Sequence, residues 1–204
     1  MTMSYLCAIL MPSRSAPEVI AKALRSMFNN AETPMQVQAV LRLDEGWLPS
    51  DHLGQLKMAF PMLTFVVGPR LNGYHSVPEY LAECGRATDA RWLWPLDDDY
   101  EIGGRGWDSR LIEAEDRGYS YAQPAMYYLH NCFYENTGAG YGPQGMVMKR
   151  QHFDWVCQHY VAPKAWDLCA QEHARGNVIA PLRGISLRHH WDEARSVARR
   201  EGRL

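Results

Sequence analysis

Three consecutive aspartates, Asp97, Asp98 and Asp99, directly follow the apolar segment "RWLWPL". Like charges this close repel one another and are costly to bury, so a positive partner is expected beside them. In an extended strand alternate residues face the same side, which groups Asp97 with Asp99 and turns Asp98 away. Sites for Mg²⁺ or Mn²⁺ at phosphates use one or two protein carboxylates and take further oxygens from a diphosphate. The cluster therefore predicts a metal site for a nucleotide diphosphate; the alternative interpretation is an acidic surface turn.

The first half of the sequence alternates strand patterns with helix patterns. Two Ser-x-x-Glu motifs, Ser15 with Glu18 and Ser76 with Glu79, predict capping boxes at helix starts. Alternating strands and helices predict an α/β domain with a mainly parallel sheet, in which ligands bind beyond the carboxyl ends of the strands. The strands are expected at about residues 5–11, 35–43, 63–69 and 91–96, so the aspartates follow the fourth strand.

The second half is less regular. Strand patterns cover residues 119–129 and 146–150, helix patterns cover 151–160 and 164–175, and short strand segments are expected within 176–191. The residues from Asp192 onward have the pattern of a basic surface helix.

Composition and charge limit the class of protein. A chain of 204 residues with 47% hydrophobic residues fits one globular domain, and its net charge of −2 gives no general attraction to nucleic acid or anionic membranes. Its five cysteines include no C-x-x-C pair, which argues against a zinc knuckle and a disulfide framework. The apolar N-terminal segment is too short for a signal peptide, and no stretch has the length of a membrane-spanning helix. We therefore expect a cytoplasmic protein, in a bacterium or in a phage-infected host.

Three segments carry a resemblance to a known family. In order, "MPSRSAPEVIAKALRSM", "VLRLDEG" and "VGPRLNGYHSVPEYLAECGRATDARWLWPLDDDYEIGGRGWDSRL" resemble family 2-like glycosyltransferases of the GT-A fold, including short phage and bacterial members. The match covers about residues 5–111 well and the remainder loosely. It implies one GT-A (Rossmann-like) domain over residues 1–204, with a nucleotide-sugar-binding half at 1–111 and an acceptor-side half at 112–204 that ends in the basic helix.

The resemblance also implies an activity. The chain would be a hexosyl- or pentosyltransferase that moves a sugar from a nucleotide diphosphate donor, with a UDP-sugar as the favoured donor, to a hydroxyl acceptor. Two alternatives stay open, namely a degenerate protein that only binds nucleotide sugars or glycans, and a sugar-phosphate nucleotidyltransferase. The second would be expected to have a glycine-rich loop after the first strand, and "MPSRSAPE" contains no glycine.

Site residues carried over from the family fall into three groups. The residues implied to bind the donor are Pro12, Ser13, Arg14, Asp44, Arg70, Asn72, Gly73, Asp97 and Asp98. The residues implied to hold Mn²⁺ or Mg²⁺ are Asp99 as principal ligand, Asp97, and one of the adjacent His189 and His190, because only one of two neighbours on a strand can face the metal. Asp167, at the start of a later helix, is the candidate general base of an inverting reaction, and Glu172 is a weaker one.

The acceptor is not specified by the sequence. Short phage members of the family can modify bases in DNA, and the arginines from Arg183 to Arg203 form a locally basic stretch. The same arginines also fit a solvated helix face, and the net charge of −2 does not favour DNA. Glycan, lipid and protein acceptors stay open, as does the choice between inversion and retention.

Overall fold

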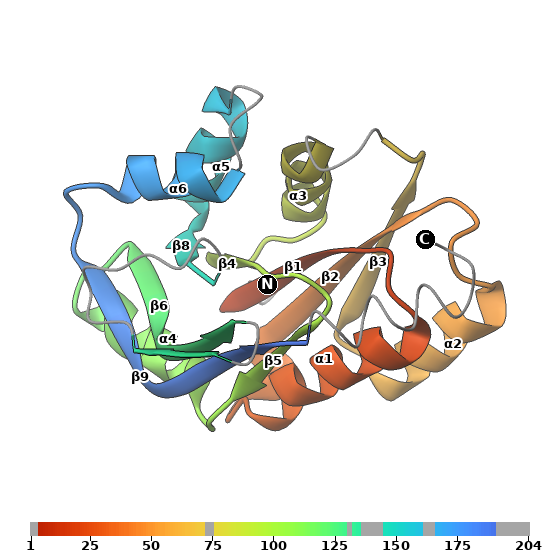
Figure 1. Cartoon of the computed structure of the whole chain (residues 1–204), viewed down its shortest axis with the longest axis horizontal. Helices are drawn as coiled ribbons and strands as arrows, with labels where there is room; N and C mark the ends of the chain where they lie inside the picture. The colour runs from red at the N-terminus through yellow and green to blue at the C-terminus, as the bar shows by residue number, and fades with distance from the viewer. Residues whose placement is uncertain (1–3, 72–75, 130–131, 136–144, 161–165, 191–204) are drawn as a thin grey trace.

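The structure is a computed structural model that describes residues 4–71, 76–129, 132–135, 145–160 and 166–190. The nine strands in these residues form one sheet in the order β3-β2-β1-β4-β8-β6-β9-β5, and β7 pairs with β6 (Figure 1). The chain therefore forms a single α/β domain, as the sequence predicts.

The first half of the chain builds the parallel part of the sheet. Parallel pairs join β3 to β2, β2 to β1 and β1 to β4. The strands are β1 (Cys7–Ser13), β2 (Val37–Asp44), β3 (Leu63–Gly68) and β4 (Trp92–Pro95). The intervening helices are α1 (Pro17–Asn29), α2 (Ser50–Ala59) and α3 (Val77–Arg86), with a 3₁₀ turn at Pro34–Gln36.

The second half extends this sheet with mixed pairing. Its strands are β5 (Tyr100–Gly103), β6 (Tyr121–Leu129), β7 (Cys132–Glu135), β8 (Val147–Lys149) and β9 (Ile179–His189). Its helices are α4 (Trp107–Asp116), α5 (Arg150–His159) and α6 (Trp166–Ala174). Strand β9 is parallel to β6 and antiparallel to β5, so the end of β9 lies beside the start of β5, directly after the three aspartates.

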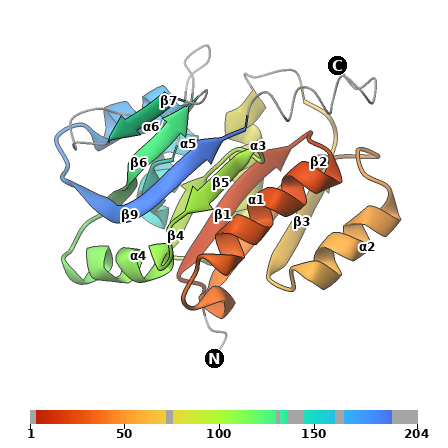
Figure 2. The same ribbon diagram turned by 60° about the horizontal axis from the view of Figure 1, so that its bottom comes forward.

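Helices cover both faces of the sheet, as Figures 1 and 2 show. One apolar core joins alternate residues of β1 and β2 to α1, α2 and α4, and a second joins the intervening residues to α3, α5 and α6. All eight residues of β2 are consequently buried, including the polar Gln38 and Arg42. Trp92 and Trp94 of β4 are fully buried, which confirms that an apolar strand leads into the aspartates.

Some sequence-based expectations differ from the structure. Helix α1 has Ala16 as its N-cap and α3 has Ser76, and neither has a side-chain capping hydrogen bond, so the predicted capping boxes do not form. The strand segments expected within 176–191 form one continuous strand, β9, because β5 and β6 pair with it on either side. The predicted basic helix from Asp192 lies outside the described residues. Among the described helices none is long and apolar enough to cross a membrane.

Candidate functional site

Several of the predicted donor-binding residues, among them Ser13, Asp44 and Asp98, lie at or directly after the carboxyl ends of β1, β2 and β4. Parallel register places Ser13 of β1 beside Leu43, the residue before Asp44 at the end of β2. The turn that contains Asp98 and Asp99 follows β4, which pairs with β1 on the other side. Three segments far apart in sequence thus meet at one edge of the sheet, where parallel α/β sheets bind ligands.

Asp98 joins the loop after β1 to the aspartate turn. Its Oδ2 accepts a short hydrogen bond from the Ser13 hydroxyl and a second from the Ser15 backbone N–H at 3.2 Å. Asp98 is only 8% exposed. The carboxylate oxygen that meets this loop is therefore engaged by the protein itself, and Asp98 holds the loop in place rather than pointing away from it.

The surroundings of Asp98 favour its protonated form. Burial raises the pKa of this carboxyl to about 6, and the neighbouring charge of Asp99 adds to the rise. The hydrogen bonds from Ser13 and Ser15 act in the opposite direction because they stabilise the charged form, but they only partly offset the burial. Within the described residues, the charge of an ionised Asp98 is therefore only partly compensated.

Asp97 and Asp99 do not lie on one face of an extended strand. Residues 98–99 form a turn closed by a 3.3 Å hydrogen bond from the Tyr100 N–H to the Asp97 carbonyl. The expected alternation fails here because β4 ends at Pro95 and the chain must reverse into β5. Asp97 is half-buried, whereas Asp99 is 8% exposed.

Asp99 is paired with a histidine from the end of β9. The Asp99 Oδ2 lies 3.1 Å from His189 Nε2, and the His189 ring stacks on Tyr100 with centroids 4.5 Å apart. The other carboxylate oxygen, Asp99 Oδ1, is buried and has no hydrogen-bond partner among the described residues. An unsatisfied buried carboxylate oxygen requires an explanation, and an absent cation is a direct one.

The second histidine of the pair faces a different acid. His190 Nε2 lies 3.1 Å from Glu101 Oε2, and its backbone N–H donates to the Asp99 carbonyl at 2.9 Å. Neighbours on a strand point to opposite sides, so His189 and not His190 is placed to share a cation with Asp99. Glu101 did not emerge from the sequence as a site residue.

Asp44 lies within a network of two arginines and a tyrosine. Its Oδ1 accepts from Arg42 Nη1 at 2.6 Å and from the Tyr80 hydroxyl at 3.2 Å, and its Oδ2 accepts from Arg14 Nε at 2.9 Å. Arg14 Nη2 also contacts the Tyr80 hydroxyl and the Leu71 carbonyl at 3.0 and 3.3 Å. The network fixes the ends of β1 and β2 to the segment that precedes residue 72.

Arg42, like Tyr80, is a residue of this network that sequence reasoning missed. Its side chain is 1% exposed, donates to Glu83 Oε2 at 2.8 Å, and stacks over the Tyr80 ring at 4.1 Å. Burial alone would lower the pKa of Arg42, but the bonds to Glu83 and Asp44 outweigh it and raise the pKa. A Cβ on Gly68 would lie 3.0 Å from Arg42 Nη2, so the glycine leaves room for the guanidinium.

The remaining predicted residues are less well defined. Pro12 is half-buried within β1, and Arg70 is exposed. Asn72 and Gly73 lie outside the described residues. Asp167 belongs to α6, which packs on α5 through Trp166 and Phe153 with ring centroids 5.8 Å apart, but its side chain is not described. Glu172 belongs to the same helix.

The residues present fit a divalent cation that a ligand helps to coordinate. No group of three or more His, Cys, Asp and Glu side chains that could hold a metal occurs in the part of the chain that the structure describes. Asp99 and His189 instead supply a carboxylate and an imidazole in contact, which are suitable donors for Mn²⁺. Metals at phosphate-handling sites commonly have only one or two protein ligands.

Comparisons with known proteins identify the fold. No protein-family model and no curated protein matches the sequence. Among solved structures the chain is similar to S. aureus TarS, residues 1–349, in complex with UDP, with a TM-score of 0.68 and 10% identity. A second TarS 1–349 structure gives the same TM-score of 0.68 at 11% identity. Each alignment covers 97% of this chain and 64% of the TarS chain, so this chain spans 64% of that length. The likeness shows the GT-A fold that the sequence led us to expect.

Proposed function

With the GT-A fold as premise, we propose that the chain is a metal-dependent glycosyltransferase that moves a sugar from a UDP-sugar to a hydroxyl acceptor. One observation carries this proposal: the loop after β1, Asp44, and the Asp97–Asp99 turn with His189 meet at the carboxyl edge of the parallel strands. The UDP bound to TarS, which shares the fold, supports uridine diphosphate as the donor nucleotide. We further propose that the transferred sugar is a hexose or a pentose.

Donor binding is assigned to the loop after β1 and to the Asp44 network. Ser13 and Ser15 are fixed by Asp98, so the loop needs little reorganisation when a ligand arrives. Arg14 is held by Asp44 and retains 34% side-chain exposure, which leaves its guanidinium accessible to a diphosphate or a nucleobase. Asp44 acts in this proposal chiefly by orienting Arg14. Pro12, Arg70, Asn72, Gly73 and Asp97 complete the proposed donor site.

Asp99 and His189 would hold Mn²⁺ or Mg²⁺. The buried Asp99 Oδ1 supports this role, because it has no hydrogen-bond partner within the described residues. When bound, the metal supplies positive charge that neutralises the diphosphate leaving group. Tyr100 stacks on the His189 ring, and this contact fixes the orientation of the imidazole toward Asp99. Asp97, directly before the turn, would supply a further carboxylate to the metal.

In this proposal Asp167 is the general base that removes the proton of the acceptor hydroxyl. A carboxylate at the start of α6 can remove a proton from an acceptor hydroxyl if the reaction inverts the anomeric centre, and a retaining reaction would not need it. The acceptor itself is proposed only as a hydroxyl compound.

The test measures binding and turnover of UDP-sugars with and without Mn²⁺. We expect Mn²⁺ to strengthen UDP binding in thermal-shift and calorimetric titrations, and Asp99→Asn to remove the Mn²⁺ dependence while leaving a folded protein. Asp51→Asn is the matched control, since Asp51 is an exposed carboxylate on α2. Equal Mn²⁺ dependence in Asp99→Asn and in the wild type would contradict the metal site.

Turnover separates an enzyme from a binding protein. We expect Mn²⁺-dependent release of UDP from a donor sugar, at a rate that Asp99→Asn lowers by about 100-fold or more, as loss of a group that stabilises leaving-group charge typically does. Binding of UDP without any release, across a panel of donor sugars and hydroxyl acceptors, would identify the chain as a nucleotide-sugar binding protein.

A further inference from the structure

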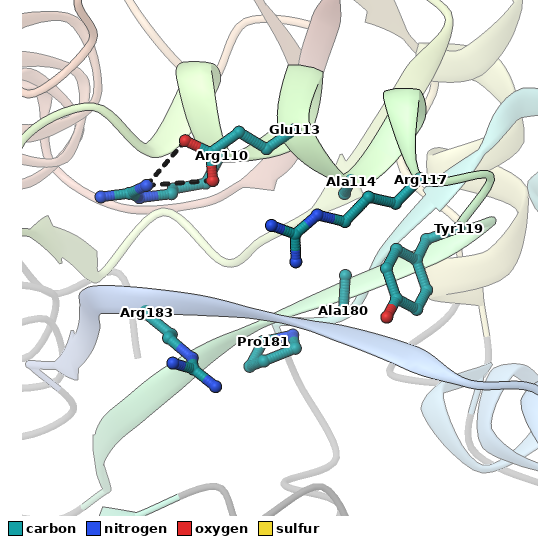
Figure 3. A pocket seen from close by; sticks show the side chains of 8 residues that line it. All are labelled: Arg110, Glu113, Ala114, Arg117, Tyr119, Ala180, Pro181 and Arg183. Carbon is teal, nitrogen blue, oxygen red and sulfur yellow. Dashed lines mark hydrogen bonds and ion pairs between the residues drawn. The ribbon is translucent and has the colours of Figure 1, made fainter.

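A polar cavity lies away from the candidate donor site, between α4 with the residues that follow it and the start of β9. Its volume is about 350 Å³, within the range that small ligands occupy. Figure 3 shows side chains from both elements around it, with Arg110 and Arg117 on the α4 side and Arg183 on β9. We call it the arginine pocket.

Two of the three arginines have uncompensated charge. Arg110 Nη1 forms a bidentate pair with Glu113 at 2.7 and 2.9 Å, drawn as dashed lines in Figure 3. Within the described residues, the Arg117 and Arg183 side chains form no ion pair or hydrogen bond. The nearby acid Glu115 is engaged by Arg91 at 3.3 Å, and Asp116 does not line the cavity. As far as the described part of the chain shows, the pocket therefore presents two guanidinium groups without a bonded partner.

The rest of the lining suits a compact ligand. The buried Ala114 and Ala180 and the exposed Pro181 give the lining its apolar part, and the half-buried Tyr119 adds a hydroxyl. Small apolar residues leave room for a ligand, and the planar guanidinium groups provide donors in a fixed fork. The lining has donors for an anion and no free carboxylate to repel it.

The number of donors favours phosphate over carboxylate. A carboxylate has two oxygens, which one bidentate arginine satisfies, whereas a phosphate group has three or more oxygens and can engage two arginine forks and a hydroxyl. We propose that the arginine pocket binds a phosphate group, as the free anion or within a phosphate ester, through Arg117, Arg183 and Tyr119.

This site is distinct from the proposed donor site. Arg183 precedes His189 by six positions on β9, which is at most about 20 Å at roughly 3.3 Å per residue of strand, and an irregularity in the pairing with β6 between Leu182 and Ser186 shortens this distance. None of the residues that line the arginine pocket belongs to the proposed donor or metal site. The proposal therefore holds whether or not the chain transfers a sugar.

The experiment observes the arginine side chains directly. In ¹H–¹⁵N spectra of the wild-type protein at low ionic strength, inorganic phosphate and dimethyl phosphate are titrated in separate arms, and the Nε–Hε signals are assigned with Arg117→Gln and Arg183→Gln. We expect the Arg117 and Arg183 signals to shift together with saturation. Each substitution should weaken phosphate binding about tenfold, since charge-assisted hydrogen bonds are lost. Arg25→Gln, an exposed arginine of α1, is the matched charge control and should bind like the wild type.

The two arms distinguish the sources of the phosphate. Tighter binding of inorganic phosphate indicates a site for the free anion, and tighter binding of dimethyl phosphate indicates a site for a phosphodiester; both support the proposal. Unchanged signals of Arg117 and Arg183 overturn it, as does binding that Arg117→Gln and Arg183→Gln weaken no more than Arg25→Gln does.

Discussion

Replacing the buried Arg42 with methionine tests the network that holds Asp44. Methionine keeps most of the side-chain volume but removes the charge, so Asp44 and Glu83 lose hydrogen bonds of 2.6 and 2.8 Å. Removing one partner of a buried pair costs about 3–5 kcal/mol, because the remaining charge is left buried. Asp44 keeps Arg14 and Tyr80, and Glu83 is 28% exposed, so we expect the lower end, about 3 kcal/mol.

The measurement is urea unfolding followed by tryptophan fluorescence, supported by thermal melts. For a chain of this size, a loss of about 3 kcal/mol lowers the Tm by roughly 6–12 °C. Arg91→Met is the control, because the Arg91–Glu115 pair spans 3.3 Å with side chains 54% and 26% exposed. Exposed pairs contribute about 0–1 kcal/mol, so this variant should unfold close to the wild type.

A second substitution tests the cause of the loss. Glu83→Gln removes one of the charges that Arg42→Met leaves unpaired, so the double variant should lose less stability than the sum of the single variants. A stability loss in Arg42→Met no larger than that in Arg91→Met would contradict a buried unpaired charge as the cause, and so would simple additivity of the effects at Arg42 and Glu83. On the proposed function, Arg42→Met should also weaken UDP binding, because Asp44 loses its bond to Arg42 and then orients Arg14 less firmly.

Two further predictions concern the aspartate turn and the strand beside it. In metal-free buffer, Asp98→Asn should gain stability relative to the wild type as pH rises from 4 to 7, by up to about 3 kcal/mol. The pKa of Asp98 is about 6 in the folded protein against 3.8 for a free carboxyl, so the wild type loses stability as pH rises from 3.8 through 6 and the buried carboxyl ionises. Urea unfolding at a series of pH values checks this, and a stability difference that shrinks as pH rises would contradict the buried carboxyl. Gly104→Ala should cost more than Gly118→Ala, since both glycines have positive φ, +86° and +77°, but only at Gly104 would a Cβ lie 2.1 Å from a backbone oxygen, that of Gly184. A positive φ alone costs about 1–3 kcal/mol, and thermal melts showing equal losses would refute the close approach of these two segments.

The sequence was sufficient to predict the parallel half of the sheet. Runs such as "CAILM" and "RWLWPL" are apolar enough to be buried on both faces, and the helix pattern at residues 17–29 separates β1 from β2. These patterns are local, so they can be recognised without knowing what they contact. They also place Ser13, Asp44 and the aspartates at strand ends, which is where the structure has them.

Arg42 shows where local patterns are insufficient. Alternation of Gln38 and Arg42 with apolar residues correctly predicts a strand, but it does not reveal that α3 covers the polar face. The guanidinium is stable there only because Glu83 and Tyr80, about forty residues later in the chain, provide an ion pair and an aromatic face. Helix α3 supplies those groups, and its packing on β2 is a tertiary feature.

For the three aspartates too, the sequence predicts one property and the tertiary structure decides another. Residue type and position alone establish that negative charge collects at the end of a buried strand and needs a cation or a proton. The roles of the individual carboxylates depend on partners 83 to 90 residues distant: Ser13 and Ser15 for Asp98, and His189 for Asp99. The turn after β4 and the pairing of β5 with β9 bring those partners into contact. Hydrogen bonds extend only about 3 Å, so only the folded chain determines which carboxylate holds the loop and which lies beside the histidine.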